Sequence, residues 1–236
     1  MKKAIAAGQL VTIMIVLIAF VLIAGTITRF QSKLEGQEAE LLCKNSLLLR
    51  AKTKIEVGSV AAVSTPALCK TLDRKFSAEN KEEALDFVSK NMERCWWMWL
   101  EGQSNEIFGP RGLFGSDEKT KCFICYSLFY EDGPSFTSTD LLKNLNKLGS
   151  RYRGGGSILS YIQENGYVDA LDESYSSGNI FAVVFASNID ESIWKSSFQR
   201  LLGFDPPYNQ NGIWLTSFNR FEKVQPCYYE PDIAGK

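Results

Sequence analysis

The sequence predicts an α+β domain attached to an N-terminal membrane anchor. An uninterrupted apolar stretch lies near the N-terminus, and helical and strand patterns follow it without the regular spacing of βαβ units. All six cysteines come after this stretch, so we expect a disulfide-linked domain. The expected parts are a leader and anchor over 1–28, an amphipathic helical stalk over 29–54, and an extracytoplasmic mixed α+β domain over 55–236.

Composition separates these parts. The chain has 236 residues, of which 45% are hydrophobic and 22% are charged, as in ordinary globular proteins. No charged residue occurs from Ala4 to Thr28, whereas the chain from Arg29 onward holds 24 basic and 27 acidic residues, a net charge of −3. Because this body has no basic excess, we expect no nucleic-acid partner.

The anchor is predicted from the length of the apolar stretch. A bilayer core needs about 20 helical apolar residues, and Gln9–Thr28 supplies them, with residues 10–28 expected to contact lipid. A cleaved secretory signal is disfavoured because its apolar region is shorter, at about 7–15 residues. Lys2 and Lys3 precede the stretch, so the N-terminus is expected in the cytoplasm and the body outside the cell membrane.

The stalk is predicted from leucines that recur every seven residues. Leu34, Leu41 and Leu48 follow this spacing, with Leu42 and Leu49 beside them, so they form one stripe of a helix. A helix that packs on its own domain needs the same stripe. A coiled coil is disfavoured because Gln37 and Lys44 place polar side chains at intervening positions.

The domain is expected to contain both helices and strands. The best-defined helix runs over Asn80–Glu101, with Ser77 or Asn80 as its N-cap. Its expected apolar face holds Leu85, Val88, Met92, Cys95, Trp96 and Trp99. The other expected elements are strands over Ile55–Val63, Lys121–Tyr130, Ile180–Ser187 and Ile213–Val224, and helices over Thr137–Leu148 (capped by Ser138 or Thr139), Ile158–Glu164 and Ile189–Leu202. We expect a loop over Asn105–Asp117 and tyrosine-rich turns between Glu164 and Ile180.

Two surface features could bind a ligand. Trp97 and Met98 point off the apolar face of the expected helix and are a candidate binding surface, although a tryptophan-rich turn more often fills a core. Gly154, Gly155 and Gly156 stand between Arg153 and a helix, where backbone N–H groups can bind an anion. The spacing lacks the P-loop pattern, so a hinge is the favoured interpretation.

The cysteines are Cys43, Cys69, Cys95, Cys122, Cys125 and Cys227. Pairing of neighbouring segments favours Cys43 with Cys69, and Cys95 with either Cys122 or Cys125, leaving Cys227 for the remaining thiol. Cys122 and Cys125 also form a CxxC motif, so a membrane-anchored thiol-disulfide oxidoreductase is one alternative. The strand-like sequence after Cys125 argues against it. A single CxxC without histidine also disfavours a zinc site, and we expect no metal and no cofactor.

The chain contains no histidine. Histidine-dependent triads, histidine-ligated metals and a histidine general base are therefore excluded, and no other catalytic group stands out. We expect a protein without enzymatic activity.

The start of the chain resembles the class III signal peptides of archaeal pilins and archaellins. A short basic leader precedes Gly8 and Gln9, and an apolar helix follows directly. The resemblance implies cleavage between Gly8 and Gln9 and assembly into a filament through the apolar helix. It extends over about the first 50 residues, and it departs from the family in having Ala6 and Ala7 where a basic residue is usual.

The body resembles a group of archaeal, membrane-anchored, cysteine-containing surface proteins with no known activity. The matching features are Cys43 with Ser46 and Arg50, Cys69, Cys95-Trp96 leading to Glu101-Gly102, and the pair Cys122 and Cys125. This resemblance implies an extracytoplasmic domain with disulfide bonds. The expected function is a structural or protein-binding role in the cell envelope, through other envelope proteins or self-assembly, with a pilin-like filament subunit as the alternative.

Overall fold

The computed structural model describes residues 14, 36–49, 51, 67–103, 121–170, 172, 174–187, 211–218 and 228–229. The chain divides into two compact units, Met1–Glu40 and Leu41–Lys236, and every element labelled below belongs to the second. Within the described residues, no helix has the length and apolar character needed to cross a membrane. The predicted anchor, the cleavage position Gly8–Gln9, the strand at Ile55–Val63, the loop at Asn105–Asp117 and the helix at Ile189–Leu202 fall outside the described residues, apart from Met14.

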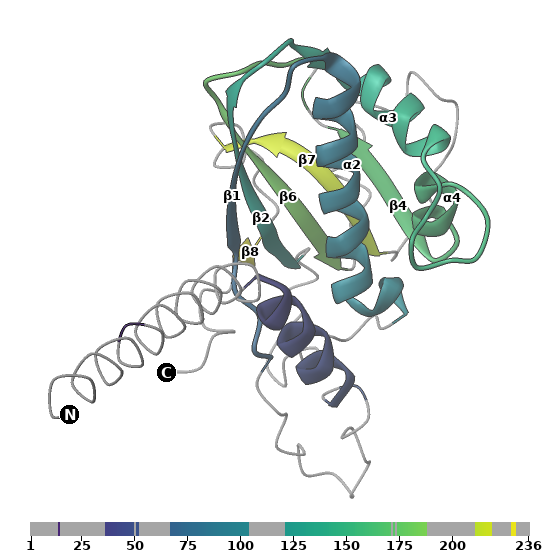
Figure 1. Cartoon of the computed structure of the whole chain (residues 1–236). Helices are drawn as coiled ribbons and strands as arrows, with labels where there is room; N and C mark the ends of the chain where they lie inside the picture. Colours follow the sequence, from purple (N-terminus) through teal and green to yellow (C-terminus); the bar gives the residue numbers. More distant parts are fainter. Residues whose placement is uncertain are drawn as a thin grey trace, which may run out of the picture. The chain divides into compact units, whose positions relative to one another are not determined.

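A mixed β-sheet forms the centre of the second unit, which is an α+β fold (Figure 1). Its strand order is β1-β2-β6-β7-β4, and β8 also pairs with β2. The neighbours β1 and β2 are parallel, as are β4 and β7, whereas β6 is antiparallel to both β2 and β7. The bounds are β1 Leu72–Ser77, β2 Lys121–Asp132, β4 Gly166–Ala170, β6 Ile180–Ser187, β7 Asn211–Ser217 and β8 Tyr228–Tyr229.

The helices α2, α3 and α4 lie over one face of this sheet (Figure 1). Their bounds are Lys81–Met98, Ser138–Lys147 and Ile158–Gln163. A short helix, η1, covers Leu100–Gly102, and β3 (Phe136–Thr137) pairs with β5 (Ser174–Tyr175) in a separate two-stranded sheet. Residues 36–49 are helical, in agreement with the predicted stalk over that range.

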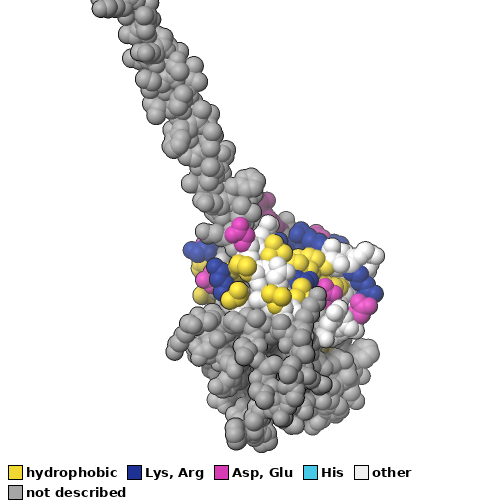
Figure 2. Space-filling model, turned by 90° about the horizontal axis from the view of Figure 1, so that it is seen from below, with side chains coloured by type: hydrophobic (Ala, Val, Ile, Leu, Met, Phe, Trp, Pro, Cys, Tyr) yellow, Lys and Arg dark blue, Asp and Glu magenta, His cyan; other side chains and the backbone are white. Residues whose placement is uncertain are grey.

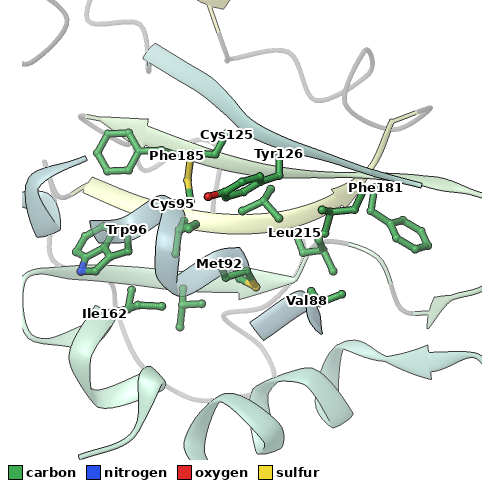
Figure 3. Packing of buried hydrophobic residues seen from close by; sticks show 14 of the residues in the cluster. Val88, Met92, Cys95, Trp96, Cys125, Tyr126, Ile162, Phe181, Phe185 and Leu215 are labelled. Carbon is green, nitrogen blue, oxygen red and sulfur yellow. A yellow bond between two sulfur atoms is a disulfide. The ribbon is translucent and has the colours of Figure 1, made fainter. Parts of the chain in front are cut away.

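Helix α2 lies between the parallel strands β1 and β2 in the chain and packs its apolar face into the core. It begins where the Asn80 side chain accepts a hydrogen bond from the Glu83 backbone N–H, so Asn80 is the N-cap and Ser77 belongs to β1. Its apolar face meets the sheet through fully or almost fully buried side chains (Figure 3). This face is the one that the sequence predicted: Leu85, Val88, Met92, Cys95, Trp96 and Trp99.

Strand β2 changes its pairing with β6 at Cys125, where the register shifts between Ile124 and Tyr126. In a regular strand, alternate residues face the same side of the sheet. Cys122 and Ile124 belong to one buried cluster, with Trp214, whereas Cys125, Tyr126 and the next alternate residues belong to the cluster beneath α2. The extra residue of this bulge therefore turns the second half of β2, including Leu128 and Tyr130, toward the helices.

Two glycines make room for Trp96. A Cβ atom on Gly166 would lie 2.2 Å from Cη2 of Trp96, and one on Gly102 would lie 2.4 Å from the same atom. The indole thus fits between η1 and the first residue of β4. Asn211 adds to this arrangement, because its Nδ2 donates to the Gly102 carbonyl at 2.8 Å.

Several predicted boundaries need correction. Thr137 is the N-cap of α3 and forms a capping box with Asp140, so neither Ser138 nor Thr139 caps it. The stretch predicted as tyrosine-rich turns contains β4 and β5, which are short strands with few alternating apolar residues. Strand β1 was not predicted because Asp73, Arg74 and Lys75 make it polar. The strand predicted at Ile213–Val224 begins at Asn211, and β7 ends at Ser217.

Candidate binding surfaces

Trp97 and Met98 have different surroundings in the structure. Met98 is only 3% exposed, so its assignment to a binding surface was wrong: the side chain is part of the core. Trp97 is half-buried and stacks on Tyr152, with ring centroids 5.0 Å apart and planes 13° apart. The Nζ atom of Lys44 lies 4.0 Å from the centroid of the Trp97 ring, within the range of a cation–π interaction.

Lys44 also pairs with Glu101 on η1. Its Nζ atom is 3.6 Å from Oε1 of Glu101. Burial lowers the pKa of Lys44 from its ordinary value, and the charge of Glu101 partly opposes this effect. The ammonium group thus joins the helical residues 41–49 to the end of α2 through one aromatic ring and one carboxylate.

The backbone at Glu101 is unusual for a residue with a side chain. Leu100, Glu101 and Gly102 have φ values of 54°, 59° and 70°, three successive residues in the left-handed region. Only glycine adopts this region without a steric cost. The surrounding contacts hold the strained turn in place: Gly102 fits against Trp96, and Glu101 pairs with Lys44.

The loop that contains the three glycines binds a carboxylate of the protein itself, through residues that precede the glycines. Glu93 of α2 is 1% exposed, and its Oε1 accepts hydrogen bonds from Ser150 Oγ and from the backbone N–H of Arg151, both at 2.7 Å. Arg153 pairs with Glu164, the C-cap of α4, at 2.6 Å. Backbone pairing between Gly149 and Ser157 closes the loop on itself. These contacts hold the loop against α2 and the end of α4.

Tyr161 lies on α4 near the same groups and is 4% exposed. Burial raises its pKa well above the ordinary range, and the negative charges of Glu101 and Glu93 raise it further. A neutral phenol in this position can act only as a hydrogen-bonding group near neutral pH. The cluster around Trp97 therefore combines aromatic rings with charges that are already paired inside the protein.

The cysteines of the CxxC motif are not bonded to each other. Cys125 forms a disulfide with Cys95 on α2, and both residues are fully buried (Figure 3). Cys122, on the other side of the bulge, is disulfide-bonded as well. Cys227, the predicted partner of the remaining thiol, lies outside the described residues. A thioredoxin-like pair needs two cysteines that bond to each other at a helix N-terminus, and this strand does not provide that arrangement.

The second predicted disulfide joins Cys43 to Cys69. It holds the helical residues 41–49 against the segment before β1. Next to it, Ser46 Oγ accepts a hydrogen bond from the Leu68 backbone N–H at 2.8 Å. Cys43, Ser46 and Leu47 are buried and form the inner face of the helix.

The outer face of the same helix is apolar and exposed. We call its large side chains, together with the adjacent Leu68, the leucine surface. The members and their exposed fractions are Leu41 (49%), Leu42 (55%), Leu48 (37%), Leu49 (57%) and Leu68 (54%). The space-filling view in Figure 2 shows hydrophobic side chains dispersed among Lys, Arg, Asp and Glu on one face of the molecule. Leu41 and Leu48, which have the seven-residue spacing, are thus not the residues that attach this helix to the domain.

No metal site was found: among the described residues, no group of three or more Cys, Asp or Glu side chains could hold an ion.

Comparison of the chain with protein families, with curated proteins and with solved structures found no match. The interpretation of the site therefore depends on its own chemistry.

Sequence patterns missed most of the contacts around Trp97. Lys44, Glu93, Tyr152 and Tyr161 come from segments far apart in the chain, and no motif connects them. One signal was present: Lys44 interrupts the apolar spacing of the stalk. A polar residue on the inner side of an amphipathic helix indicates a specific partner, here Glu101 and Trp97.

Proposed function

We propose that this protein is a single-span, membrane-anchored domain on the outer side of the cell membrane, where it binds another envelope protein without catalysing a reaction. The observation that carries the binding role is the leucine surface. Soluble surfaces rarely place several large apolar side chains next to each other unless they contact a partner. The leucine surface also lies shortly after the predicted anchor at residues 10–28, so a partner in the same membrane is within reach.

The disulfides support the proposed location on the outer side of the cell membrane. Disulfides persist in oxidising environments and are rare where thiols are kept reduced. Cys43–Cys69 and Cys95–Cys125 are both formed, and within the described part of the chain there is no free cysteine. The two lysines before the apolar stretch favour the same orientation, with the body outside.

Thiol trapping in intact cells tests the proposal. Free thiols are blocked at once with a membrane-permeant alkylating reagent, and the protein is then purified from the membrane fraction and mapped by mass spectrometry without reduction. We expect both disulfides to be intact and the protein to stay in the membrane after a high-salt or alkaline wash. Reduced, alkylated cysteines or a soluble protein would rule out the proposed location.

The same preparation distinguishes the anchored protein from a pilin-like filament subunit. The resemblance at Gly8–Gln9 motivates the second candidate, in which the leader is removed before assembly. A native N-terminus at Met1 or Lys2 supports the uncleaved anchor. A chain that begins at Gln9 supports the filament subunit.

A further inference from the structure

We propose that the leucine surface binds a second copy of this chain, in parallel and within the same membrane. This inference depends on the proposed location, because it needs both copies to share one bilayer. It goes further than the proposed function by naming the bound envelope protein as a second copy of the same chain. The argument uses the spacing of the leucines, the polar residue between them and the small size of the surface.

The spacing favours a helix as the partner. An α-helix turns by about 100° per residue, so Leu41, Leu42, Leu48 and Leu49 fall within about 120° of its circumference. Cys43, Ser46 and Leu47 point to the other side, toward the domain. The described residues hold one seven-residue step of this spacing, which suits a short side-by-side contact between two helices and not a continuous coiled coil. Two parallel copies would bring each leucine opposite its equivalent.

Asn45 favours a copy of the same helix over lipid. It is exposed and lies in the middle of the arc that the leucines occupy. In acyl chains an amide without partners is costly, whereas in a symmetric parallel pair the two Asn45 amides can bond to each other and fix the register. The neighbouring charges also disfavour an anionic bilayer surface: Glu38, which precedes the leucines, is exposed, and the ammonium of Lys44 is held by Glu101.

The size of the surface explains why the membrane is needed. A stable interface between free proteins buries about 800 Å² on each partner, which is more than a few half-exposed leucines provide. Two copies held in one bilayer meet at a high effective concentration, so a weak contact is enough. We therefore expect association of the anchored chain at cellular density and dissociation when the protein is diluted in detergent.

Photo-crosslinking of the full-length protein in its own membrane tests this proposal. A photoreactive amino acid replaces Leu42 in one variant and Ile180 in a matched control, because Ile180 is an exposed hydrophobic residue of β6 outside the leucine surface. Two differently tagged versions are expressed together. We expect a crosslinked product that carries both tags from Leu42, at least tenfold more abundant than from Ile180.

Disruption of the surface supplies the second measurement. Leu41→Glu together with Leu48→Glu should reduce the doubly tagged product from position 42 at least tenfold, because four carboxylates would face each other. Formation of the Cys43–Cys69 disulfide reports whether the helix is still attached to the domain. An unchanged yield in a correctly bonded variant would contradict the proposal.

The other possible crosslinking results would contradict the proposal. Crosslinks from Leu42 to a different protein, to lipid only, or to nothing would each overturn self-association. The proposed location outside the cell membrane is tested independently by thiol trapping. If that location is wrong, the cysteines are reduced, whatever crosslinks form.

Discussion

Helix α2 and the helical residues 41–49 are attached to the same domain in different ways. Helix α2 buries a continuous apolar face against the sheet, and the Cys95–Cys125 disulfide joins its last turn to β2. Residues 41–49 bury little apolar surface there, mainly Leu47, and are held by the Cys43–Cys69 disulfide and the polar contacts of Lys44 and Ser46. The first attachment should fail only when the whole domain unfolds, whereas the second should open locally.

The adjacent tryptophans Trp96 and Trp97 give the largest expected difference. Trp96 is fully buried between Gly102 and Gly166, so Trp96→Ala should lower the free energy of unfolding by about 3–5 kcal/mol. Trp97→Ala loses the stacking on Tyr152 and the contact with Lys44, and should cost about 1–2 kcal/mol. Urea unfolding followed by circular dichroism measures both. Equal losses would mean that Trp97 belongs to the core as much as Trp96.

Removing the two disulfides one at a time distinguishes the stability of the whole domain from that of residues 41–49. The bonded cysteines are 26 and 30 residues apart in sequence, so the loop-closure contributions are similar, at about 3–4 kcal/mol. Cys95→Ala with Cys125→Ala should lower the stability of the whole domain by at least that amount, because two buried sulfurs are lost as well. Cys43→Ala with Cys69→Ala should leave the melting of the α2–sheet core within a few degrees and make residues 41–49 sensitive to protease. A large loss of thermal stability in the second variant would show that this helix is part of the cooperative core.

Alkaline pH tests the buried tyrosines of the domain. The pKa of Tyr161 is raised by burial, and burial raises that of Tyr167 to about 12, whereas an unfolded tyrosine ionises near 10. Above pH 10 the unfolded chain releases protons that the folded chain keeps, so stability should fall as the pH rises from 10 to 12. Tyr161→Phe should reduce this slope while changing stability at pH 8 by about 1 kcal/mol or less. Urea midpoints at pH 8 and pH 11 provide the measurement, and an unchanged slope would contradict the burial of this phenol.

The effect confined to the smallest part of the molecule is that of Lys44→Met. It removes the ion pair with Glu101 and the cation–π contact with Trp97, together about 0.5–2 kcal/mol of local stability. Hydrogen exchange should become faster in residues 41–49 and remain unchanged in α2. Lys90→Met is the matched control, because Lys90 pairs with Asp86 on the surface of α2 and should contribute about 0.5 kcal/mol or less. Equal exchange rates in wild type and Lys44→Met would show that the disulfide alone holds the helix.

The α+β class, helix α2 with its Asn80 cap, and strand β6 were predictable because each has a local pattern. Helix α2 repeats apolar residues with helical spacing, and β6 is a short apolar run, which is typical of a strand covered on both faces. Strand β1 could not be found in this way. It is an edge strand with charged residues, and only its pairing with β2 makes it a strand.

The cysteine pairing was also predicted only in part from the sequence. Proximity in sequence favoured Cys43 with Cys69 and narrowed the partner of Cys95 to two residues. Strand alternation alone does not choose between Cys122 and Cys125. The tertiary structure decides, because α2 covers the side of the sheet on which Phe123 and Cys125 lie, whereas Cys122 and Ile124 lie on the other side.

By itself, the sequence determined the local properties of this protein: an apolar stretch long enough to span a bilayer, a body without histidine, and a leucine repeat in a helix. These three properties follow from the composition of the chain and from the spacing of leucines within one helix. The tertiary structure decided which face of that helix stays exposed, and that the glycine-rich loop binds the carboxylate of Glu93. Such outcomes depend on contacts between segments more than 50 residues apart, as from Glu93 to Arg151 and from Lys44 to Glu101, and no local pattern encodes them.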